Sequence, residues 1–191
     1  MERPRVVRED GALDGDVVRA VLAGDVDRYA ELVQRYRDKY ARYAARMLGS
    51  LDAADDAVQD AFIRAYEQLA QCRDPANFAG WFFLILRNRC FAERRSSGRL
   101  GKRTSLESDP VAAPDDAGRR LEDEELRQRL QRELMELTPE QREVFVLKHI
   151  EELSYEEIAA RIGGSVAALK MRMHRAYDRL RERLTREEAR T

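Results

Sequence analysis

The segment from residue 78 to 103 combines aromatic side chains with basic ones. Its first nine residues include three phenylalanines and a tryptophan, and the rest carries seven basic residues against a single acid, Glu93. Unpaired nucleic acid binds to such a combination, because aromatic faces stack on bases and cations hold the phosphate backbone. Helical spacing leaves two roles open for Trp81 and Phe83, which could stack on bases or pack in the core.

A second basic stretch near the end of the chain follows a helix-turn-helix pattern. Ser154 is expected to cap a short helix, Gly163 and Gly164 break it, and Ser165 caps a longer helix that runs to about Arg186. Between residues 165 and 186 the chain has seven Lys and Arg against two acids. A basic helix after such a turn is typical of proteins that read the major groove. The side chains expected to face the DNA are Ser165, Lys170, Arg172 and Arg175.

A third candidate surface lies on the helix expected over about 51–71. Apolar residues recur on one side of this helix, and the other side carries Asp56, Gln59, Asp60 and Ile63. An isoleucine among polar and acidic residues is typical of a protein-contact surface, although a single exposed apolar side chain is also ordinary.

The composition excludes several classes of protein. The chain has 191 residues with 35 Lys and Arg against 36 Asp and Glu, so a uniformly basic nucleic-acid coat is excluded. No apolar run approaches the roughly 20 residues of a membrane span, and the first ten residues lack the apolar core of a secretory signal. Cys72 and Cys90 are too few for a disulfide framework, and with His149 and His174 far apart no metal site is indicated. We expect a cytoplasmic chain without membrane insertion.

The elements that position these residues are all expected to be helices, because no stretch shows sustained alternation and the prolines and glycines fall between helical stretches. The sequence predicts an all-α protein of two small helical domains. Helices over about 14–23, 26–48, 51–71 and 77–95 form the first domain, residues 14–95. Residues 96–118 are rich in small residues and proline and are expected to be a flexible linker. Residues 119–186 form the second domain.

Taken together, these motifs resemble those of the extracytoplasmic-function (group 4) sigma factors of bacterial RNA polymerase. The resemblance covers about residues 16–95 and 121–185. Residues 55–66 match the family's polymerase-binding helix, and Phe78-x-x-Trp81 with Arg87-Asn88 matches the helix that engages the −10 element. Pro139-x-Gln141-Arg142 opens the C-terminal domain in the family's manner, and residues 154–176 complete its helix-turn-helix.

The resemblance implies a fold, a function and a set of partners. The first domain would be a region 2-like four-helix domain and the second a region 4-like helix-turn-helix domain. The partners would be the clamp and flap of the polymerase core, promoter DNA that is duplex at −35 and single-stranded at −10, and an anti-sigma factor. The polymerase would be bound through Asp56, Gln59, Asp60 and Ile63, and the −35 element through Ser165, Lys170, Arg172 and Arg175. The −10 element would be bound through Asn77, Trp81, Arg87, Asn88, Arg94 and Arg95.

Two other functions can be weighed against this one. A stand-alone helix-turn-helix activator with an N-terminal sensory or dimerisation domain would explain residues 138–186 equally well. It would not explain the aromatic and basic helix or the acidic surface with Ile63. An enzyme is not indicated, because the sequence has no nucleophile–base constellation, phosphate-binding glycine loop or metal-ligand set. We therefore expect no catalytic residues and no cofactor.

Overall fold

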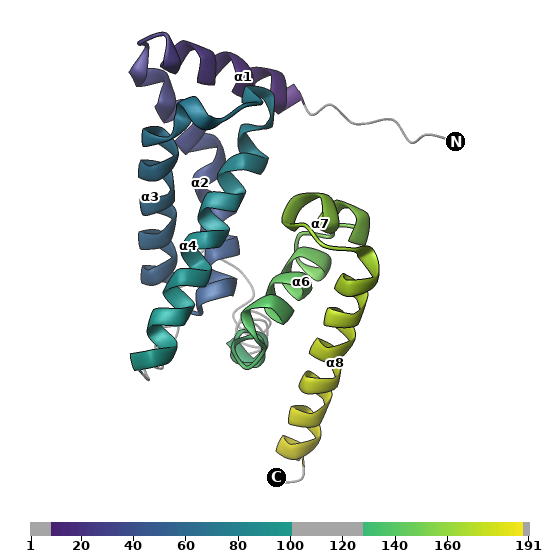
Figure 1. Ribbon diagram of the computed structural model, residues 1–191. Coiled ribbons are helices and arrows are strands. Elements are labelled where there is room, and N and C mark those ends of the chain that lie inside the picture. Colours follow the sequence, from purple (N-terminus) through teal and green to yellow (C-terminus); the bar gives the residue numbers. More distant parts are fainter. Residues whose placement is uncertain (1–8, 101–127, 189–191) are drawn as a thin grey trace, which may run out of the picture.

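A computed structural model describes residues 9–100 and 128–188 of the chain (Figure 1). Within these ranges every regular element is a helix and no strand occurs, so the predicted all-α class is confirmed. The first domain consists of α1 (Glu9–Leu22), η1 (Val26–Arg28), α2 (Tyr29–Leu48), α3 (Leu51–Glu67), η2 (Leu69–Gln71), η3 (Pro75–Asn77) and α4 (Phe78–Leu100). In Figure 1, α2, α3 and α4 run alongside one another and α1 lies across one end of them.

Local sequence signals set the turn between α2 and α3. Gly49 adopts a left-handed conformation with φ of 76° and ends α2, which few other residues would do without strain. Ser50 then caps α3, because its hydroxyl oxygen accepts a hydrogen bond from the backbone N–H of Ala53. This turn brings α2 and α3 side by side.

Aromatic rings fill the space between α2, α3 and α4. The rings of Phe62 and Phe82 have centroids 4.2 Å apart, and Phe82 also packs on Tyr40. The Tyr40 hydroxyl donates a hydrogen bond of 2.7 Å to the carbonyl oxygen of Ala79, which attaches α2 to the first turn of α4. Phe83 is only 2% exposed, so of its two possible roles the structure assigns it to the core.

Three helices of the first domain have limits that differ from the prediction. The first begins at Glu9, five residues before its expected start. The third ends at Glu67, and the turn η2 follows it before residue 71. The fourth continues past residue 95 to Leu100, so it includes the first residues of the segment expected as a linker. Gly98 costs a helix only about 1 kcal/mol, and no proline follows before Pro110 to stop it. The rest of the expected linker, and the expected helix up to residue 127, lie outside the described residues.

The second domain comprises helical residues 128–135, α6 (Pro139–His149), α7 (Tyr155–Ile162) and α8 (Val166–Glu188). Capping boxes begin both α6 and α7. In each, the N-cap hydroxyl of Thr138 or Ser154 accepts from a backbone N–H, and a Gln or Glu three residues later reaches back to the N-cap N–H. The predicted helix-turn-helix is therefore confirmed, with α8 as its second helix.

The two domains pack directly against each other, with α6 beside the C-terminal part of α2 (Figure 1). Arg142 of α6 is completely buried at this contact. Its guanidinium donates to the carbonyl oxygens of Leu134 and Leu137 in its own domain, and at 2.5 Å to that of Met47 at the end of α2. Apolar residues of both domains consequently form one continuous core.

We expect Ser50→Ala to lower the free energy of unfolding by about 1 kcal/mol, because the first turn of α3 then loses the acceptor for one of its free N–H groups. Urea unfolding followed by circular dichroism would measure the change. Ser50→Thr keeps the hydroxyl and should retain most of the stability. Equal losses in the two variants would show that packing at this position, and not capping, holds the turn.

Candidate nucleic-acid interface

The predicted −10 residues of α4 lie on two different faces of the helix. Trp81, Asn88 and Arg95 follow one another at intervals of seven residues, or about two helical turns, so they share one face of α4. Asn88 and Arg95 are exposed, and Trp81 is half-buried against Phe78 with ring centroids 6.0 Å apart. This face therefore offers one aromatic side chain and two polar ones to solvent.

Arg87 and Arg94 form the other face of α4, which is directed at the second domain. The Nε and Nη2 atoms of Arg87 donate to the two carboxylate oxygens of Glu143 at 2.5 Å and 2.9 Å. The hydrogen bonds to Glu143 raise the pKa of Arg87, whereas burial raises the pKa of the Glu143 carboxyl. The bidentate pairing with Arg87 and the charge of Arg172 oppose that rise in pKa. We therefore take Glu143 to be ionised at neutral pH. The six predicted residues thus do not make one continuous surface.

Asn77 lies at the junction of η3 and α4 and is exposed. Its side chain folds over the first turn of α4, where a Cβ atom on Gly80 would come within 2.5 Å of its Oδ1 atom. Gly80 is therefore the residue that leaves room for Asn77. The prediction from sequence missed it, although a glycine within the first turn of a helix is a recognisable signal of close approach.

The predicted −35 residues differ in how far they reach from α8. Lys170 and Arg175 are exposed, whereas Arg172 is half-buried and its charge acts on Glu143. The Ser165 hydroxyl oxygen accepts from the Ala168 N–H at 3.1 Å and so caps the helix. Met171 lies among these residues with 55% of its surface exposed and was not predicted as part of the site.

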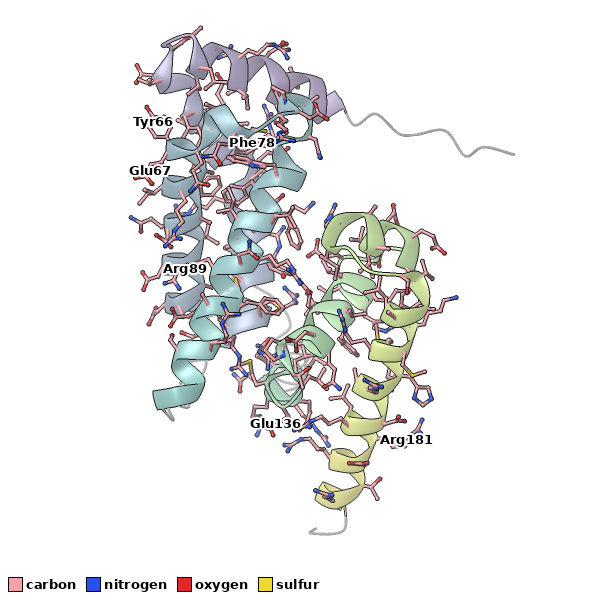
Figure 2. The ribbon with its side chains drawn as sticks, in the orientation of Figure 1. Tyr66, Glu67, Phe78, Arg89, Glu136 and Arg181 are labelled. Carbon is pink, nitrogen blue, oxygen red and sulfur yellow. The ribbon has the colours of Figure 1, made fainter. Side chains whose placement is uncertain are left out.

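The predicted protein-contact surface on α3 is mostly open to solvent. Asp56, Gln59 and Ile63 are exposed, with Ile63 at 51%. Asp60 is different, because its carboxylate lies 3.0 Å from the Nε atom of Arg64 and 2.8 Å from that of Arg89 on α4. Figure 2 shows Arg89 directed at α3, away from the second domain. Asp60 thus joins α3 to α4 and is only partly available to a partner.

Tyr66 extends the exposed surface of α3 and was not among the predicted contact residues. It is 44% exposed, and its ring packs edge-on against Tyr29 with centroids 5.1 Å apart. Figure 2 shows it on the outer side of α3 together with Glu67. The exposed side of α3 therefore combines two apolar side chains, Ile63 and Tyr66, with acidic ones.

The remaining candidates for chemistry have structural roles. Cys72 and Cys90 are buried and unpaired, and burial raises the pKa of both thiols, that of Cys90 to about 12. They are consequently protonated and unreactive at neutral pH, as expected of small core residues. Within residues 9–100 and 128–188 no three His, Cys, Asp or Glu side chains lie close enough together to hold a metal ion. None of the described helices is long and apolar enough to cross a membrane.

Family models match both domains of the chain. The model of sigma-70 region 2 matches residues 32–100, and that of sigma-70 region 4 matches residues 127–180. The two matches fall on the helices that carry the surfaces described above: α3 and α4 in the first, and α8 in the second.

Relatives match the chain over nearly its whole length. The ECF RNA polymerase sigma factor SigW of Bacillus subtilis is 32% identical over 87% of this chain and 94% of its own. The ECF sigma-E factor of Escherichia coli is also 32% identical, over 86% of this chain and 91% of its own.

Two solved structures share the fold. The structure of CnrH in complex with the cytosolic domain of CnrY has a TM-score of 0.62 and 29% identity, and the match covers 90% of this chain and 97% of that one. The sigma factor RpoE of Bartonella quintana, in complex with the anti-sigma factor NepR, has a TM-score of 0.62 and 25% identity, with 82% and 96% covered. Full-length relatives at this identity, with both domain models in the same order, show that the chain belongs to the extracytoplasmic-function sigma factors of RNA polymerase.

Proposed function

We propose that this sigma factor binds the polymerase core through α3, the separated −10 strand through α4 and the −35 duplex through the first half of α8. The placement of these helices carries the proposal. In Figure 1, α3 and α8 lie at opposite sides of the molecule with α4 between them. A chain built in this way can hold a protein on one side while it presents basic helices to DNA on the others.

The contact with the polymerase core is assigned to Asp56, Gln59 and Ile63, with Asp60 as a partial contributor. An exposed isoleucine supplies apolar area that a partner can bury, and the neighbouring acids favour a basic partner surface. Tyr66 extends this surface, because it is exposed three residues, a little under one turn, further along α3 than Ile63. The same side of α3 is furthest from the second domain, so docking there would leave the DNA-binding helices accessible.

The contact with the −10 element is assigned to Asn77, Trp81, Asn88 and Arg95, with Arg87 and Arg94 on the adjoining face. Trp81 is half-buried against Phe78, so its ring is held in a defined orientation with one part open to solvent. A base that leaves the duplex can stack on such a ring, and arginines two turns apart can follow the backbone. The role of Asn77 fits its exposed position beside the start of α4.

The contact with the −35 element is assigned to Ser165, Lys170, Arg172 and Arg175. The exposed cations Lys170 and Arg175 suit guanine edges and phosphates, whereas half-buried Arg172 has less reach. Met171 adds an apolar surface in the same half of the helix. An apolar side chain in the major groove contacts the 5-methyl group of thymine, which distinguishes it from the other bases.

We also infer that an anti-sigma factor holds this chain when it is inactive. CnrH and RpoE of Bartonella quintana were each solved with a protein bound, which in the second case is named as an anti-sigma factor. The stand-alone activator is not favoured, because both relatives quoted are polymerase sigma factors that match the first domain as well as the second.

Reconstitution with sigma-free bacterial core polymerase tests the proposed function. We expect the full chain to support transcription from a random promoter library and to enrich two short elements about two helical turns apart. Failure to bind core polymerase, together with selection of a palindromic duplex by the chain alone, would contradict the sigma function and favour the activator.

We expect Asp56→Lys to weaken capture by core polymerase about tenfold or more. The substituted lysine would face a basic partner surface, and like charges brought together across an interface cost over about 1 kcal/mol. Pull-down of purified core at several protein concentrations would measure the loss. Asp38→Lys makes the same charge change at an exposed position of α2 and should bind as the unchanged chain does. Asp56 is preferred to Asp60 for this test, because reversing Asp60 would also break the contact between α3 and α4. Equal capture of both variants would remove α3 as the docking surface.

We expect transcription from a promoter to fall about fourfold when the thymine that Met171 contacts in the −35 element is replaced by deoxyuridine. A fourfold change corresponds to the roughly 0.8 kcal/mol that one buried methyl or methylene group contributes. Met171→Ser should transcribe the two templates equally, because its side chain gains nothing from the methyl group. Single-round transcription would compare the four combinations. A deoxyuridine effect that persists in Met171→Ser would assign methyl recognition to another residue.

A further inference from the structure

The turn Pro75–Asn77, which ends in one of the proposed −10 contacts, lies against glycines of two helices. A Cβ atom on Gly11 of α1 would come within 3.0 Å of the carbonyl oxygen of Ala76. On α4, a Cβ atom on Gly80 would come within 2.5 Å of the Asn77 Oδ1 atom. Both separations are shorter than ordinary van der Waals contact. Ala76 and Asn77 can therefore lie where they do because Gly11 and Gly80 have no side chains.

A buried carboxylate holds α1 in place against α2. Asp14 is 1% exposed, and its carboxylate accepts hydrogen bonds from the guanidinium of Arg35 and the hydroxyl of Tyr36. Burial and the hydrogen bond to Asp14 raise the pKa of Tyr36, so its hydroxyl stays protonated and remains a donor. Separating such a pair would leave a buried charge without compensation, which is costly. A shift of α1 away from α2 is therefore opposed.

The core holds α1 on the side of η3 and α4 as well. Val17 and Val18 of α1 are buried in the core of the first domain. Figure 2 shows Phe78, the first residue of α4, directly beneath α1, which packs against both η3 and α4. A new side chain on this face of α1 would consequently displace the turn Pro75–Asn77, because the helix itself is fixed.

We propose that Gly11 and Gly80 are positioning residues for promoter selection, which fix Asn77 against one base of the −10 strand. The proposal rests on the −10 contact proposed above for Asn77. An amide distinguishes unpaired bases through hydrogen bonds to their edges, and such bonds keep to about 2.7–3.2 Å. A Cβ atom on Gly11 would move Ala76 by a few tenths of an ångström, which is comparable with that range. α1 thereby influences which base is accepted without contacting the DNA.

The test uses the full chain with purified core polymerase, and it first finds the base that Asn77 reads. Promoters that carry each of the four bases at every −10 position are transcribed with the unchanged chain and with Asn77→Ala. Discrimination is the ratio of transcription from the preferred base to that from the others. The position at which Asn77→Ala loses discrimination is the position that Asn77 reads.

We expect Gly11→Ala and Gly80→Ala to lower discrimination at that same position about fivefold, the factor that one typical hydrogen bond contributes. Discrimination at the other −10 positions and capture by core polymerase should stay unchanged. Alanine favours a helix over glycine by about 1 kcal/mol, so loss of helix is not expected to contribute. A merely structural role would lower transcription from all promoters alike, and that result would overturn the proposal.

Gly15→Ala is the matched control, one turn further along α1. Its Cβ atom would lie 3.4 Å from the backbone nitrogen of Ala76, which is ordinary contact. It would also lie 3.3 Å from the end of the Arg19 side chain, which is exposed and free to move aside. Gly15→Ala should therefore discriminate as the unchanged chain does. Equal losses in Gly11→Ala and Gly15→Ala would assign the effect to α1 as a whole and overturn the role of Gly11.

The remaining outcomes separate this proposal from the function on which it rests. If Asn77→Ala relaxes one position and Gly11→Ala does not, the role of α1 is overturned and the −10 contact of Asn77 stands. If Asn77→Ala relaxes no position, both are overturned. Promoter-specific transcription by the unchanged chain would keep the sigma function in place in either case.

A second variant of α1 covers the case in which Gly11→Ala does not fold. Asp14→Asn keeps the shape of the side chain and removes the charge that holds Arg35, so α1 should be less firmly fixed. We expect discrimination to fall at the position read by Asn77, by less than in Gly80→Ala. Unchanged discrimination in a folded Asp14→Asn chain would then count against the role of α1.

Discussion

The buried guanidinium of Arg142 is the interaction on which the arrangement of the two domains depends. The last carbonyl groups of a helix have no partner within it and carry partial negative charge. Arg142 donates to Met47 in the last turn of α2, to Leu134 in the last turn of the helical segment before α6, and to Leu137 just after that segment. One cation thereby satisfies helix ends from both domains. Its pKa falls to about 9 through burial, so it remains charged at neutral pH and needs all of these acceptors.

The nearly equal numbers of acidic and basic residues are explained in part by ion pairs within the fold. Several acids are committed to particular arginines: Glu143 binds Arg87, Asp60 binds Arg89, and Glu133 with Glu136 binds Arg183. The cations that remain exposed include Lys170 and Arg175 on α8 and Arg95 on α4. Weak attraction of the free chain for DNA follows from this distribution, because counterion release scales with the cations that can reach phosphates. A sigma factor with these properties would depend on the polymerase core to bring its helices to a promoter.

Much of the helical framework could be predicted because it depends on local rules. The cap at Ser154 lies where the sequence predicts it. Ser50, Thr138 and Gly49 also belong to residue types that favour helix ends. α4 continues five residues beyond its predicted end, because a helix tolerates the Ser and Gly residues that follow Arg95 at modest cost. Met171 was missed for a different reason. Helical periodicity separates inward from outward positions, but an outward methionine gives no signal of its own until its exposure is known.

The sequence by itself determined the helices, their order, the helix-turn-helix and the three surfaces with their residue types. Each of these follows from periodicity, capping and composition within about twenty consecutive residues. Only the tertiary structure decided that Phe83 is core, that Asp60 joins α3 to α4, and that Arg87 and Arg94 face the second domain. The pairing of Arg87 with Glu143 joins residues 56 positions apart in the chain. No local pattern specifies such a pair, because its partners meet only when the two domains pack against each other and bury a common surface.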